Sequence, residues 1–172
     1  MSGIWRALRS LLTTVMMGLG VISALLMLAF LTVDDPEIPR FSVMAALAVM
    51  SAVFLTSATI MARSAAWRGH AMPVSHRRNR WLHFGGLGAG TILNGLGIPI
   101  IVGAKELGPF WAPPVTGFGV CLLVADVAIL FSSILLSLYF LRFGVWRGAT
   151  AFLFGSVIGW VGGAIQAELF FR

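Results

Sequence analysis

Long runs of apolar residues alternate with short polar connections along the whole chain. Five runs are long enough for a helix to cross the roughly 30 Å hydrocarbon layer, which takes about 20 apolar residues. They cover residues 11–33, 41–62, 82–104, 115–141 and 148–167. Because lipid offers no hydrogen-bond partners to backbone groups, a spanning segment must pair them internally, as a helix does. The pattern therefore predicts an all-α bundle of five transmembrane helices in a single domain, residues 1–172.

The connections between the runs carry residues that end helices. DDPEIPR, between the first and second runs, contains Pro36 and Pro39, and proline interrupts the helical hydrogen-bond ladder. Pro113 and Pro114 precede the fourth run, and the first turn of a helix tolerates proline. Pro99 lies near the end of the third run, where we expect it to kink the helix.

Composition indicates which solvent surrounds this bundle. The chain is 59% hydrophobic and 10% charged, and its mean hydropathy is +0.96. About a quarter of the residues of a soluble domain are charged, because its surface faces water. This chain has too few charges to cover a globule of its length, so we expect lipid to contact much of its surface. The first run is too long for the apolar part of a secretory signal peptide, and we interpret it as a retained anchor.

The basic residues are unevenly shared between the two sides that such a bundle would have. With the N-terminus inside, nine of the 12 Lys and Arg residues lie on the cytoplasmic side. Such a bias predicts a cytoplasmic N-terminus, a periplasmic or extracellular C-terminus, and location in the inner (plasma) membrane. Tryptophan agrees, because indoles collect at membrane surfaces and five of the six tryptophans lie at the ends of runs. Trp160 is the exception, inside the fifth run.

The most basic connection reads WRGHAMPVSHRRNRW, from Trp67 to Trp81. Its first role is to fix the topology, as expected of any multi-pass protein. A more specific interpretation is contact with an acidic partner or with anionic lipid such as cardiolipin, which juxtamembrane arginines attract. The residues for this contact are Arg63, Arg68, Arg77, Arg78 and Arg80. We expect no nucleic-acid partner, because no recognition module accompanies the loop. We expect no metal either, since His70 and His76 alone make an incomplete site.

Asp126 is the one acid deep inside a run. It lies eleven residues from the start of the fourth run, or about 16 Å deep at 1.5 Å per residue. A carboxylate exposed to lipid there would cost several kcal/mol, so we expect Asp126 to face protein or water, and to be neutral or to hold a cation. Asn94, at a matching depth in the third run, is a candidate neighbour. On the fourth run Gly119, Asp126, Ser133 and Ser137 share one helical face.

Two interpretations of this intramembrane polar site, Asp126, Asn94, Ser133 and Ser137, stay open. In the first, the polar side chains hydrogen-bond between helices and hold the bundle together. In the second, they form a proton or cation path in which Asp126 titrates.

Glycines occur at four-residue spacing in the third and fifth runs. Such steps let helix backbones approach closely in membranes. They are Gly86 and Gly90 in the third run, and Gly155, Gly159 and Gly163 in the fifth. The row in the fifth run could face another chain, which would favour assembly, or could pack within the bundle.

The chain offers little chemistry for catalysis. No histidine lies deep in a run, and no serine or cysteine has an evident histidine partner, so we expect neither a cofactor nor an enzyme. The leading hypothesis is a non-catalytic integral membrane subunit, or an assembly or accessory factor, of a larger inner-membrane complex. The alternative is a small homo-oligomeric channel or transporter that uses Asp126 for proton or cation passage. A third hypothesis is a lipid-handling protein. The expected partners are the lipid bilayer, other membrane subunits or further copies of the chain.

Overall fold

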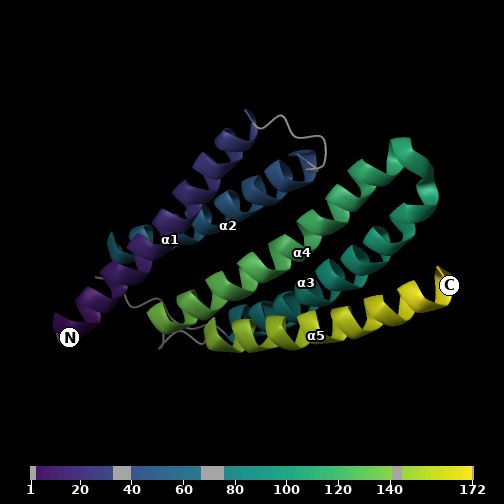
Figure 1. The fold of residues 1–172 in the computed structure, drawn as a ribbon. Helices are drawn as coiled ribbons and strands as arrows, with labels where there is room; N and C mark the ends of the chain where they lie inside the picture. The colour runs from purple at the N-terminus through teal and green to yellow at the C-terminus, as the bar shows by residue number, and fades with distance from the viewer. Residues whose placement is uncertain (1–2, 33–39, 67–75, 141–144, 172) are drawn as a thin grey trace.

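The computed structural model describes residues 3–32, 40–66, 76–140 and 145–171. Within these ranges the chain forms five α-helices and one short 3-10 helix, η1, and no strand, so the all-α prediction is confirmed (Figure 1). The elements are α1 Gly3–Phe30, α2 Arg40–Ala66, α3 His76–Gly103, η1 Ala104–Leu107, α4 Gly108–Tyr139 and α5 Val145–Phe170.

Four helical stretches are long and apolar enough to cross a membrane: Gly3–Phe30, Arg40–Arg63, Arg80–Tyr139 and Val145–Phe170. The third stretch has 60 residues and includes most of α3 and all of α4, which lie side by side and are joined through η1 (Figure 1). These lengths and compositions are those of a multi-pass membrane protein. Five crossings and the inward N-terminus stay predictions.

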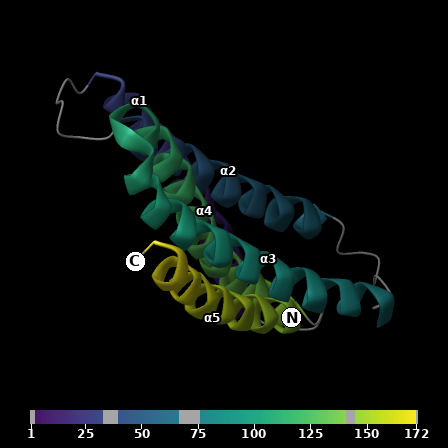
Figure 2. The same cartoon turned by 90° about the vertical axis from the view of Figure 1, so that its right-hand side faces the viewer.

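The helices form two pairs joined by α4. The pair α1–α2 lies on one side of α4, and the pair α3–α5 lies on the other (Figures 1 and 2). Helices α1, α3 and α5 begin where α2 and α4 end, and we call this end of the bundle the arginine end. Of the residues whose side chains the structure describes, it carries Arg6, Arg9, Arg63, Arg80 and Arg147. The opposite end, which includes η1, is called the far end.

A small apolar core joins α1, α2 and α4. Its buried members are Leu12, Met16, Phe54, Ala58, Met61, Ala128 and Tyr139. The rings of Phe54 and Phe131 meet edge to face at 6.1 Å. Between α1 and α2, the Ser51 hydroxyl donates a 2.9 Å hydrogen bond to the Gly20 carbonyl. The core is modest because every helix leaves large apolar side chains exposed, which is expected where lipid covers them.

Helices α3 and α5 run in the same direction and touch through their glycines. A Cβ on Gly86 would lie 2.7 Å from the Gly148 carbonyl oxygen, and one on Gly163 would lie 2.8 Å from the Asn94 carbonyl oxygen. Cβ atoms on Gly155 and Gly159 would clash with the carbonyl oxygens of Leu87 and Thr91. Glycine therefore brings the two backbones into direct contact, which maximises van der Waals contact between membrane helices.

Helix α4 begins earlier than the sequence indicated. The chain turns at Gly108, whose φ of +74° favours glycine, and the helix starts there, seven residues before Val115. Pro113 and Pro114 accordingly lie inside α4, near its N-terminus. Their missing N–H groups leave carbonyls of the first helical turn unpaired, and these lie near the end of the bundle, where water can reach them. Helix α3 continues through Pro99 to Gly103.

Candidate functional site

The clearest candidate site is the carboxyl group of Asp126, between α4 and α5. The side chain is buried, with 6% of its surface exposed. The hydroxyl oxygen of Ser156 on α5 lies 2.7 Å from Oδ1 of Asp126 and 2.9 Å from the Phe152 carbonyl oxygen. Asp126 thus faces protein, and its one hydrogen-bond partner within the described residues comes from another helix.

The Ser156 hydroxyl can hydrogen-bond to Asp126 whether the acid is a carboxylate or a carboxylic acid. A hydroxyl has one proton to donate and lone pairs to accept with. Beside a carboxylate, Ser156 donates to Asp126. Beside a carboxylic acid, Asp126 can donate to Ser156, which then donates to the Phe152 carbonyl. The pair can therefore gain or lose a proton without losing the hydrogen bond between α4 and α5.

Gly90 on α3 makes room for this contact. A Cβ on Gly90 would lie 2.5 Å from the Phe152 carbonyl oxygen and 2.8 Å from the Ser156 hydroxyl oxygen. Both atoms belong to the turn of α5 that carries the partner of Asp126. A side chain at position 90 would displace this turn. The hydrogen bond between Asp126 and Ser156 therefore depends on the close contact of Gly90 with α5.

Asn94 of α3 lies at the depth of Asp126, but no described hydrogen bond joins the two side chains. In the antiparallel hairpin of α3 and α4, a Cβ on Gly97 would lie 2.9 Å from the Leu123 side chain. Asn94 is three residues before Gly97, and Asp126 is three residues after Leu123, so the two residues lie at matching depth along the hairpin. Asn94 is also buried, at 6% exposed, but its amide donates a long 3.4 Å bond to the Gly90 carbonyl. Among the described residues no hydrogen bond joins Asn94 to Asp126.

The serines of the expected polar stripe bond to their own helix. The Ser133 hydroxyl donates to the Leu130 carbonyl at 2.8 Å, and the Ser137 hydroxyl donates to the Ser133 carbonyl at 2.6 Å. Both side chains are half-buried. The two hydroxyls are therefore not linked to Asp126 by hydrogen bonds. The neighbouring Ser132, which the sequence did not single out, is 3% exposed, and its hydroxyl has no described partner.

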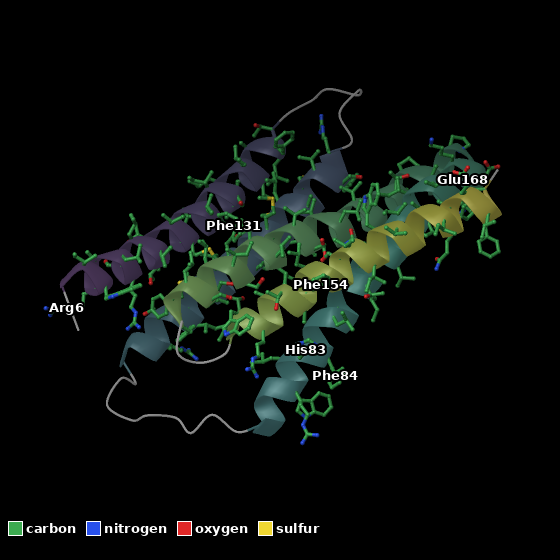
Figure 3. The ribbon with its side chains drawn as sticks, turned by 90° about the horizontal axis from the view of Figure 1, so that it is seen from below. Arg6, His83, Phe84, Phe131, Phe154 and Glu168 are labelled. Atoms are coloured by element: carbon green, nitrogen blue, oxygen red, sulfur yellow. The ribbon has the colours of Figure 1, made fainter. Side chains whose placement is uncertain are left out.

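The arginines of the basic connection are only partly within the described residues. Arg63, at the end of α2, and Arg80, in α3, are exposed at the arginine end. Arg68 lies outside the described residues, as does His70. Arg77 and Arg78 belong to α3, but their side chains lie outside the description. His83 is exposed on α3 beside Phe84, away from Arg6 at the start of α1 (Figure 3).

The described ranges contain no group of three or more His, Cys, Asp or Glu side chains placed to hold a metal ion. An apolar groove of about 530 Å³ lies at the far end, between the starts of α2 and α4. Its walls are Ser42, Val43, Ala46, Leu47, Ala112, Pro113, Thr116 and Val120. This lining is almost entirely apolar, so the groove offers a place for an apolar chain rather than groups for catalysis.

Comparison of the chain with protein families, with curated proteins and with solved structures finds no match. The class of protein therefore follows from the fold and composition: an all-helical, multi-pass membrane protein.

Proposed function

We propose that this chain is a non-catalytic integral membrane subunit, or an assembly factor, of a larger inner-membrane complex. The proposal rests on one side chain, Trp160, and on the face of α5 around it. Most polar side chains within the bundle, including Asp126 and Ser156, are engaged in hydrogen bonds inside the chain. The outer face of α5 therefore provides the strongest indication of an external partner.

Trp160 presents an indole ring near the middle of the membrane. It lies ten residues before the end of α5, or about 15 Å from the far end at 1.5 Å per residue. Its surface is 61% exposed. Tryptophan normally lies at the membrane surface, where its ring meets apolar chains and its N–H meets polar groups. At mid-depth lipid provides no acceptor for that N–H, and an unpaired polar group there is unfavourable.

A neighbouring helix would supply both an acceptor for the Trp160 N–H and an apolar surface for its ring. Polar side chains or backbone carbonyls of another helix accept hydrogen bonds within membranes. Around Trp160, large apolar side chains are about half exposed and form a broad surface. We call this surface the α5 outer face: Leu153, Phe154, Val157, Ile158, Trp160, Val161 and Ile165. It lies apart from the glycine row, because α3 of the same chain covers the glycines.

Photocrosslinking tests this proposal. A photoreactive amino acid replaces Trp160, and a matched control replaces Val127, which is 66% exposed near the middle of α4. We expect position 160 to form adducts with one defined membrane protein that also copurifies in mild detergent, and Trp160→Leu to weaken that copurification. Lipid adducts alone at both positions, with a monomer free of other subunits, would contradict the proposal.

A second candidate function is a small homo-oligomeric channel or transporter. The buried Asp126–Ser156 pair favours it, because the pair can take up and release a proton while keeping its hydrogen bond. The test is proton and cation flux in liposomes that contain the wild type or Asp126→Asn. Flux that Asp126→Asn abolishes would support the channel, and equal flux in both would contradict it.

A further inference from the structure

Arg9 on α1 lies over an aromatic ring at the arginine end. Its guanidinium carbon is 5.2 Å from the centre of the Tyr139 ring, a cation–π distance. The ring belongs to α4 and is buried, with 3% exposed. The Tyr139 hydroxyl donates a 3.0 Å hydrogen bond to the Met61 carbonyl of α2. Three helices thus fix the surface on which Arg9 rests.

The in-plane donors of Arg9 are left for another acceptor. Its Nε is buried and donates to no acceptor among the described residues. A cation–π contact uses none of the guanidinium N–H groups as hydrogen-bond donors to an oxygen, and the five N–H donors lie in the guanidinium plane. Because the protein covers Nε, an external acceptor would bind the terminal NH2 groups of Arg9. An oxyanion with two oxygens is the acceptor that matches the planar fork of arginine.

Among the residues that the structure describes, the charge around Arg9 is positive and uncompensated. Arg6 lies one turn earlier on α1 and is exposed (Figure 3). Both arginines lie in the first turns of α1, where the helix dipole also favours an anion. Of the described acids, Glu106 and Glu168 lie toward the far end and Asp126 lies at mid-depth. No described residue forms an ion pair with Arg6 or Arg9.

We propose that Arg9, with Arg6, binds the phosphate of an anionic phospholipid. Arg9 donates to the phosphate oxygens, and Tyr139 holds its guanidinium in place. A lipid fits better than a soluble phosphate because the two arginines adjoin the apolar part of α1. Met17 and Val21, both exposed, continue the side of Arg6 along the helix and would contact the acyl chains. The site does not depend on the proposed subunit function, since it can be measured on the isolated protein.

Native mass spectrometry of the purified, delipidated full chain tests the site. The probe lipids are phosphatidylglycerol and phosphatidylcholine with identical acyl chains. We expect phosphatidylglycerol to bind more tightly, and Arg9→Gln to weaken it about tenfold, the usual effect of losing a charged hydrogen bond. The matched control is Arg147→Gln, at the same end, where the guanidinium also lies over a ring, that of Trp146, at 5.6 Å. This control removes the same charge and is expected to change binding less than about twofold, as is usual for an exposed group.

Arg6→Gln is a second variant for the same measurement, and it decides the test if Arg9→Gln fails to fold. The Arg6 side chain is exposed, so its loss leaves the packing intact, and it is expected to weaken binding about fivefold, as for one basic residue at an anionic surface. Equal effects of Arg6→Gln and Arg147→Gln would show diffuse attraction and overturn the proposal. Equal binding of the two lipids would do the same. Displacement of the lipid by millimolar inorganic phosphate would show a soluble ligand instead, and would also overturn it.

Discussion

The hydroxyl of Ser156 on α5 lies 2.7 Å from the carboxyl oxygen of Asp126 on α4, and both side chains are buried. Three helices meet there, because Gly90 of α3 allows the turn of α5 that carries Ser156 to approach. The one acid deep in the chain is therefore held by a neighbour from a different helix. This contact ties the polar site to the glycine packing of the bundle.

Ser156→Ala should destabilise the protein. It removes the described hydrogen-bond partner of a buried carboxyl group, and leaving such a group unpaired costs about 1–3 kcal/mol. Asp126→Asn is the matched variant, because the amide oxygen can still accept from Ser156, and its effect should be smaller. Thermal unfolding in detergent, followed by circular dichroism, measures both. A Ser156→Ala melting curve that superimposes on the wild-type curve would show that the bond contributes nothing.

Gly90→Ala should destabilise the contact between α3 and α5. The added methyl group would lie 2.5 Å from the Phe152 carbonyl oxygen, so the helices must separate. Overpacking of this kind costs about 1–3 kcal/mol. Gly88→Ala is the control, since a Cβ at that position meets nothing within 4 Å. The control should be neutral or slightly stabilising, because alanine is favoured over glycine in helices by about 0.5–1 kcal/mol. Equal loss of stability in both variants would contradict the packing described for α3 and α5.

Two variants of Tyr139 distinguish the contribution of its ring to stability from that of its hydroxyl. Tyr139→Phe removes the bond to the Met61 carbonyl and should cost about 1 kcal/mol, the usual net value of one hydrogen bond. Tyr139→Ala also removes the buried ring and should cost about 3–5 kcal/mol. Phe110→Ala is a control, since that ring is 78% exposed at the far end. Chemical unfolding of the three variants in mixed micelles gives the comparison. A Tyr139→Ala protein as stable as Phe110→Ala would show that Tyr139 does not belong to the core.

Much of the fold was predictable because the apolar runs are long and end at polar, proline-containing connections. The helix bounds were less predictable. Pro113 and Pro114 indicated a helix start, yet α4 begins at Gly108. Prolines near a helix N-terminus are tolerated there because the carbonyls they leave unpaired lie near water, so they do not mark the first residue.

The polar site was only partly predictable. Asp126 stood out as a deep acid, and the structure buries it. Its partner Ser156 did not stand out, because depth along the helices fits several polar residues and only packing selects among them. Asn94 has the right depth yet bonds to the Gly90 carbonyl. The four-residue spacing of Gly155, Gly159 and Gly163 indicated close packing, but spacing cannot say which helix covers the row. Here it is α3 of the same chain.

We propose that the chain crosses the bilayer with its arginine end toward the cytoplasm. Single cysteines test it most directly, in a chain whose native Cys121 is replaced by alanine. One cysteine replaces Lys105, exposed in η1 at the far end, and the other replaces Arg80, exposed on α3 at the arginine end. With a membrane-impermeant maleimide on intact cells, freed of any outer membrane, we expect rapid labelling at position 105, and labelling at position 80 only after the membrane is opened. Labelling of both positions from the same side, or of position 80 alone from outside, would contradict this orientation.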